Sequence, residues 1–148
     1  MVRMKSLLFG GFVLLLLLTG CYLVSGERTE TVPLEEPDGA GELTVRFVSA
    51  DGETENSLAT GYPLTDMVVD VVVVAEEGEL TLEIISARRT PPLAVSGRYG
   101  MAGQGVANVQ TDGAGEIKYR ITASEVRNGN YVIRYRIRVT PTPTPSTP

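Results

Sequence analysis

The chain has 148 residues, with 13 Lys and Arg residues against 18 Asp and Glu residues, and a formal net charge of −5 at pH 7. This length suits one domain, and the acidic balance repels the phosphates of nucleic acids, so we expect no nucleic-acid partner. The chain has no histidine, so it lacks the commonest general base and the commonest metal ligand. It has a single cysteine, which excludes a disulfide within the chain and a thiolate metal cluster. We therefore expect a protein that is not an enzyme and holds neither a metal nor another cofactor.

Residues 1–20 have the composition of an export signal. Arg3 and Lys5 make the start positive, and residues 6–19 are apolar apart from small residues. The uninterrupted apolar run is about a dozen residues, which is shorter than the roughly 20 that cross a bilayer as a helix. The pattern predicts a secretory signal peptide rather than a membrane-spanning helix.

The segment Leu18-Thr19-Gly20-Cys21 resembles the lipobox of bacterial lipoproteins, in which a branched apolar residue and two small residues precede an invariant cysteine. The resemblance implies that the signal peptidase recognises Leu18, Thr19 and Gly20 and cleaves just before Cys21. It also implies that Cys21 carries fatty acyl chains and anchors the protein outside the cytoplasm on a bacterial cell membrane. Two or three acyl chains make a lasting anchor, whereas one chain holds a protein only marginally.

Two segments flanking the predicted domain lack a sustained apolar period. Residues 21–40 are rich in Glu and contain two prolines, so we expect a flexible acidic tether behind the lipidated cysteine. Residues 140–148 alternate Thr and Pro, a pattern that favours polyproline II and builds no core. We therefore expect a disordered tail at that end.

Residues 41–139 are predicted to form an all-β domain because apolar and polar side chains alternate with a period of two. The alternation is clearest in residues 42–48, 79–85, 116–122 and 131–139. Turn-forming sequences separate these segments. Residues 67–75 are nearly all valine, so we expect a central strand covered on both faces, with Asp70 at an outward-facing position.

Residues 121–133, ITASEVRNGNYVI, resemble the corner that leads into the sixth strand of immunoglobulin domains. Gly129 stands two residues before Tyr131, and Ile133 takes the place where that family often has cysteine. Arg127 replaces the usual Asp of the corner. Together with about seven short strands in about 100 residues, this predicts a single immunoglobulin-like β-sandwich.

Basic side chains alternate along the last predicted strand and recur on the strand before it. The candidate anion-binding face comprises Lys118, Arg120, Arg134, Arg136 and Arg138. Such a face would bind an anionic polymer, a lipid headgroup or an acidic partner. The acidic composition favours the alternative that Glu42, Glu79 or Glu83 pairs with these residues, since opposite charges on adjacent strands stabilise a sheet.

The sequence DGAGE occurs at residues 38–42 and again at residues 112–116. Asp and Glu in a glycine-rich loop can ligate calcium, but alanine stands in each copy where a further oxygen ligand would help. Tight turns into the following strands are therefore the favoured interpretation. The glycine-rich residues 96–105 are expected to form a long loop between strands.

These features favour a non-catalytic, lipid-anchored envelope protein that displays a β-sandwich for binding or structural association. Its expected partners are the membrane, through the lipidated Cys21, and an envelope protein or a polysaccharide. The alternative is an accessory module that recognises an anionic polymer, a polysaccharide or calcium. No motif in the sequence decides between them.

Overall fold

The computed structural model describes residues 21–34, 39–88 and 90–139, so the predictions for residues 1–20 and 140–148 lie outside the described residues. The strands are β1 (Leu23–Ser25), β2 (Arg28–Leu34), β3 (Ala40–Ala59), β4 (Asp66–Ile85), β5 (Leu93–Arg98), β6 (Gly103–Gln110) and β7 (Glu116–Ile137). All of their pairings are antiparallel. The described part of the chain contains no helix long and apolar enough to span a membrane. The all-β prediction and its strand number are confirmed.

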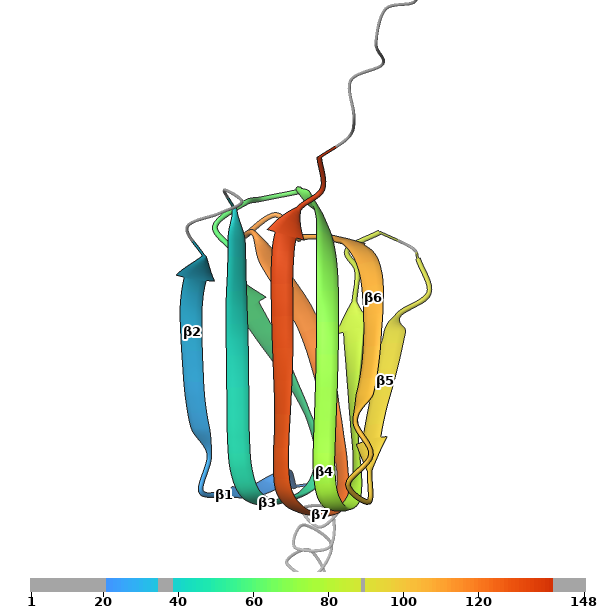
Figure 1. The fold of residues 1–148 in the computed structure, drawn as a ribbon. Helices are drawn as coiled ribbons and strands as arrows, with labels where there is room; N and C mark the ends of the chain where they lie inside the picture. Colours follow the sequence, from blue (N-terminus) through green and yellow to red (C-terminus); the bar gives the residue numbers. More distant parts are fainter. Residues whose placement is uncertain (1–20, 35–38, 89, 140–148) are drawn as a thin grey trace, which may run out of the picture.

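The three longest strands each contribute to both layers of the molecule. Residues 41–50 of β3 pair with residues 126–135 of β7, and residues 52–59 of β3 pair with residues 116–123 of β7. β4 pairs along both halves of β7 in the same way. Figure 1 shows that these strands bend over at the lower end of the molecule, so that their two halves lie in different layers.

The two layers have different strand orders. In the front layer of Figure 1, the order is β2, the first half of β3, the second half of β7, the first half of β4, and β6. In the back layer, the order is the second half of β3, the first half of β7, the second half of β4, and β5. This is the connectivity of a jelly roll, one antiparallel sheet folded across itself. The β-sandwich prediction is confirmed, whereas the connectivity differs from the immunoglobulin order. Alternation reports which face of a strand is buried but does not identify its neighbours.

Irregular backbone marks the bends. The β4–β7 ladder shifts register between Glu77 and Glu79, and such a bulge bends a strand and strengthens its twist. Gly78, inside this bulge, has a φ of 73°, a value that glycine adopts without steric cost. A Cβ at this position would lie only 2.3 Å from the carbonyl oxygen of Ser124. The bend of β4 therefore requires glycine for both its dihedral angle and its close approach to β7.

The hydrophobic core lies between the two layers. Its β4 residues, Met67, Val69, Val71, Val73 and Ala75, are fully buried, while the valines between them are only half-buried on the outer face of the front layer. The prediction that residues 67–75 are covered on both faces is wrong, because only one other layer packs against this strand. Asp70 lies on the outer face opposite Arg134, as predicted.

Strand pairing extends into two segments that were expected to be irregular. β1 and β2 pair with β3, so the tether prediction for residues 21–40 is wrong over Leu23–Ser25 and Arg28–Leu34. Every residue of β2 is exposed, and the strand is paired at the sheet edge through its backbone without needing an apolar period. Residues 96–105 likewise belong largely to β5 and β6, leaving only residues 99–102 between the strands.

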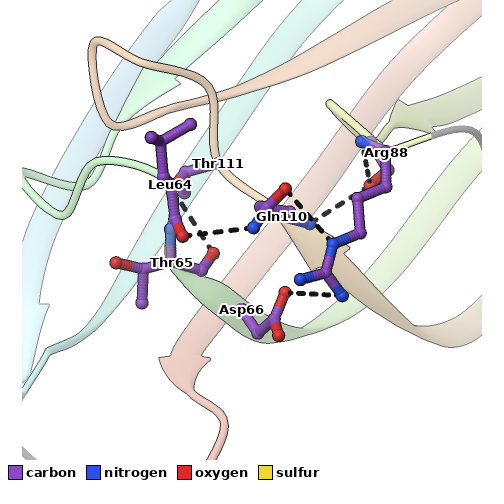
Figure 2. A network of polar contacts seen from close by, with 7 residues as sticks. Leu64, Thr65, Asp66, Arg88, Gln110 and Thr111 are labelled. Atoms are coloured by element: carbon purple, nitrogen blue, oxygen red, sulfur yellow. Dashed lines mark hydrogen bonds and ion pairs between the residues drawn. The ribbon is translucent and has the colours of Figure 1, made fainter.

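A polar network closes the end opposite the bends (Figure 2). Thr111 is fully buried; its Oγ1 donates to the Tyr62 carbonyl at 2.6 Å and accepts from the Thr65 amide at 2.9 Å. Gln110 Oε1 accepts a hydrogen bond from Arg88 Nε at 3.3 Å. These contacts hold the β3–β4 connection and the segment after β4 against the end of β6. Throughout the described residues, no buried side-chain polar atom lacks a hydrogen-bond partner.

We expect Gly78→Ala to destabilise the fold for two reasons. The left-handed backbone conformation costs alanine roughly 1–2 kcal/mol, and its Cβ would clash with the backbone of β7. Gly113→Ala is the matched control, since nothing lies within 4 Å of a Cβ there. Urea denaturation followed by circular dichroism measures both free energies of unfolding. Equal values for the two variants would contradict a steric requirement at the β4 bend.

Candidate binding groove

The structure divides the five predicted basic residues between two faces. Lys118 and Arg120 lie on the first half of β7, in the back layer; Arg134 and Arg136 lie on its second half, in the front layer, and Arg138 follows just beyond. Their outward directions are therefore opposite, and they do not form one anion-binding face. The sequence pattern suggested two neighbouring strands, whereas both segments belong to one folded strand.

Arg120 is held by carboxylates from both neighbouring strands. Its Nε donates to Glu55 Oε1 at 3.1 Å and its NH1 to Glu83 Oε2 at 3.2 Å, and Glu53 Oε1 lies 3.4 Å from its Nε. Glu55 is the main cause of a raised Arg120 pKa, with Glu83 and Glu53 contributing. The predicted cross-strand pairing is confirmed here, and the guanidinium is committed to the protein itself.

Arg134 is also paired, on the opposite layer. Its Nε donates to Glu42 Oε2 at 2.6 Å, and this hydrogen bond is the main reason that the pKa of Glu42 is lowered. Arg134, Arg136 and Asp70 border a small hollow of about 250 Å³ whose other lining residues are mostly apolar. The contact with Glu42 confirms the pairing interpretation for this arginine as well.

The second DGAGE sequence forms a turn. Asp112 Oδ1 accepts hydrogen bonds from the backbone amides of Ala114 at 2.9 Å and Glu116 at 3.0 Å. These bonds, the one from Glu116 first, lower the pKa of Asp112. The turn interpretation is confirmed for residues 112–116, whereas Asp38 of the first copy lies outside the described residues. The described residues contain no group of three or more His, Cys, Asp or Glu that could hold a metal ion.

Three tyrosines gather at an opening of about 630 Å³ between the layers, beside β2 and the second half of β3. Tyr119 and Tyr131 form its buried floor, with ring centroids 6.0 Å apart in an edge-on arrangement at 63°. Tyr22 contributes a half-buried side chain from the segment before β1. We call this opening the tyrosine groove; its polar rim comprises Glu27, Thr29, Thr54, Glu55, Asn56 and Ser57.

The groove stays open because inward positions on its two edge strands are polar. Thr54 and Asn56 of β3 pair in register with Ile121 and Tyr119, so they point toward the interior side of the sheet. Thr29 of β2 occupies the corresponding position in the opposite layer, beside Val45. Apolar side chains at these positions would pack across the gap, whereas polar ones remain solvated.

The groove combines aromatic surface with hydroxyl, amide and carboxylate groups. Burial is the main cause of the raised pKa values of Tyr22, Tyr119 and Tyr131, so their hydroxyls stay protonated to a higher pH than an exposed tyrosine. The described lining includes Glu27 and Glu55 but no Lys or Arg, and Glu55 is bound by Arg120 from the outer face. This lining suits an uncharged, hydroxyl-bearing ligand and disfavours an anion.

Sequence reasoning missed the groove for identifiable reasons. Tyr22 was assigned to the tether, and Tyr119 and Tyr131 were ordinary inward positions of alternating strands. The available signal was the polar run of residues 53–57, where threonine and asparagine occupy positions that face inward. Only the folded sheet brings that edge next to β2 and Tyr22.

Comparisons with known proteins found distant similarity to solved structures. No protein-family model matches the chain, and no curated protein matches it. Among solved structures, it is similar to the module TmCBM61 in complex with β-1,4-galactotriose (11% identity, 78% of this chain and 90% of that chain covered, TM-score 0.44). It is also similar to a carbohydrate-binding module of Cellvibrio mixtus lichenase 5A (18%, 79% and 91%, 0.37) and to the Drosophila melanogaster CENP-C cupin domain (10%, 78% and 74%, 0.32).

The buried phenols predict that stability falls at alkaline pH. The pKa of Tyr131 is raised in the folded chain, so the unfolded chain loses this proton first, near its ordinary value of 10.0. Stability is therefore fully present below about pH 10 and declines as pH rises further, by at most about 1.4 kcal/mol per pH unit for one group.

Chemical denaturation between pH 8 and pH 11 checks this expectation. Tyr131→Phe should show a shallower decline than the unmodified chain, because phenylalanine has no proton to lose. Tyr99→Phe, at a side chain that is 73% exposed, is the control and should keep the full decline. An unchanged slope in Tyr131→Phe would contradict the burial of this hydroxyl in the groove floor.

Proposed function

We propose that this chain is a non-catalytic, lipid-anchored envelope protein whose β-sandwich binds a neutral polysaccharide in the tyrosine groove. The single observation that carries the ligand class is the groove lining, which combines three tyrosines with hydroxyl, amide and carboxylate groups and, among the described residues, no base. Sugar rings offer apolar faces to aromatic side chains and hydroxyls to polar ones. A polyanion would instead meet the carboxylate of Glu27, and the cation nearest the described lining, Arg120, is already bound to Glu55.

The anchoring part of the proposal rests on the resemblance of residues 18–21 to a lipobox. Cys21 is exposed, so acyl chains on its sulfur would extend away from the domain without disturbing its core. Cleavage before Cys21 would leave β1 and β2 intact, since β1 begins at Leu23. Anchored in this way, the domain would lie outside the cytoplasm on a bacterial membrane.

The groove proposal predicts that Asn56→Ala weakens binding to a neutral polysaccharide by roughly three- to tenfold, the worth of one neutral hydrogen bond. Asn108→Ala is the matched control, because Asn108 is also an exposed strand residue but lies on β6, away from the groove. The measurement is calorimetric titration of the acylated chain in detergent with mixed-linkage β-glucan, galactan and dextran, and with alginate as a polyanion. Binding of alginate alone, or equal losses in both variants, would count against the groove.

The anchoring proposal predicts that Cys21→Ser abolishes acylation, since serine has no sulfur to modify. The unmodified chain expressed in a bacterium should sediment with membranes, and its mature form should begin at an acylated Cys21 by mass spectrometry. The variant should leave the membrane pellet or retain residues 1–20. A correctly trimmed variant that still sediments with membranes would refute anchoring through this cysteine.

A further inference from the structure

All the strand bends lie at one end of the sandwich, which we call the bend end. β3 is irregular between Ala50 and Gly52, and β4 between Glu77 and Glu79. The β5–β6 turn lies against the β4 bend, since the Gly100 amide donates to the Ala75 carbonyl at 2.8 Å. Figure 1 shows these bends together at the lower end of the molecule.

Cys21 is fixed to this same end. A Cβ on Gly52 would lie 2.5 Å from the Cys21 carbonyl oxygen, so the Cys21 backbone packs directly against the bend of β3. Tyr22 packs against the core, and β1 begins at Leu23. Cys21 and Tyr22, the two residues before β1, span at most about 7 Å. Acyl chains on Cys21 would therefore hold the bend end within a few ångströms of the lipid surface.

The bend end also carries exposed apolar side chains. Leu23, Tyr99 and Met101 are 66%, 73% and 61% exposed, and Val48 is 56% exposed. Leu23 and Tyr99 help to line a shallow hollow of about 830 Å³, and Met101 lies in the same β5–β6 turn as Tyr99. Apolar and tyrosine side chains of this kind favour the interfacial region of a bilayer, where their rings and alkyl groups leave water.

The charges at this end indicate which lipid surface fits. Among the residues that the structure describes, the hollow is lined by Asp51, Glu77 and Glu125 and by one base, Arg127. Carboxylates in excess are repelled by anionic headgroups. The surface therefore suits a zwitterionic membrane, and the apolar contact rather than charge attraction is what would hold it there.

We infer that the bend end is a membrane-contact surface: Leu23, Tyr99 and Met101 rest in the headgroup region of the bilayer that holds the acyl chains of Cys21. This inference rests on the proposed lipid anchor. In place of the predicted flexible tether, the domain stands upright on the membrane. The end that carries Leu64 and Thr111 is directed away from the membrane.

Spin labelling of the acylated protein tests this orientation. Cys21 is the single cysteine and its sulfur is blocked by acylation, so an introduced cysteine is the one reactive thiol. Met101→Cys and Leu23→Cys report the bend end, and Leu64→Cys, at a side chain that is 65% exposed, is the matched control at the opposite end. Each labelled chain is reconstituted in phosphatidylcholine vesicles, and collision with oxygen and with a water-soluble nickel complex is measured.

The inference predicts that labels at positions 23 and 101 collide several-fold less often with nickel, and more often with oxygen, than the label at position 64 in the same vesicles. The label at position 64 should be as accessible to nickel as a label on a fully exposed residue. Replacing part of the phosphatidylcholine by phosphatidylglycerol should reduce the difference in nickel accessibility between positions 23 and 101 and position 64, because the carboxylates at the bend end are repelled by anionic headgroups. Equal aqueous accessibility at all three positions in protein with confirmed acylation would overturn the inference and leave the anchor standing. Protection at 23 and 101 in a Cys21→Ser chain free of lipid and detergent would overturn it in favour of a second copy of the chain. Absence of acylation by mass spectrometry would instead refute the proposed anchor.

Discussion

The whole structure depends on one antiparallel sheet bending across itself so that its two apolar faces meet. β3, β4 and β7 are each long enough to contribute to both layers, and their ladders remain paired on either side of the bends. Glycine at the bend of β4 permits a backbone direction and a close approach that a side chain would prevent. Without these bends the valine-rich face of β4 would be exposed to water, and there would be no core.

The same folding sets the two ends and the open edge of the molecule. Bending collects Ala50–Gly52, the β4 bulge and the β5–β6 turn at one end, next to Cys21. The other end is closed by hydrogen bonds around Thr111. Between the ends, the edge formed by β2 and the second half of β3 stays open because Thr29, Thr54 and Asn56 occupy its inward positions. The tyrosine groove is thus a consequence of sheet topology.

Two of the five basic residues that the sequence singled out are paired with carboxylates across strands. Arg120 and Arg134 lie on opposite layers, and each contacts carboxylates on neighbouring strands. Such exposed pairs contribute little to stability individually, but they occupy two of the guanidinium groups that the predicted anion-binding face would use. The groove, which has aromatic rings and no base in its described lining, is therefore chemically distinct from the arginine-bearing faces that the sequence emphasised.

The sequence by itself determined the all-β class, the approximate number of strands, the outward position of Asp70 and the turn at residues 112–116, because alternation and turn chemistry are local properties. It also predicted acidic partners for Arg120 and Arg134. Only the tertiary structure decided that Lys118 and Arg134 face opposite ways, that residues 23–34 are edge strands, and that Tyr22 meets Tyr119 and Tyr131. These outcomes depend on where a strand bends and which strand lies beside it, and pairing between distant backbone segments leaves no periodic signal in either segment alone.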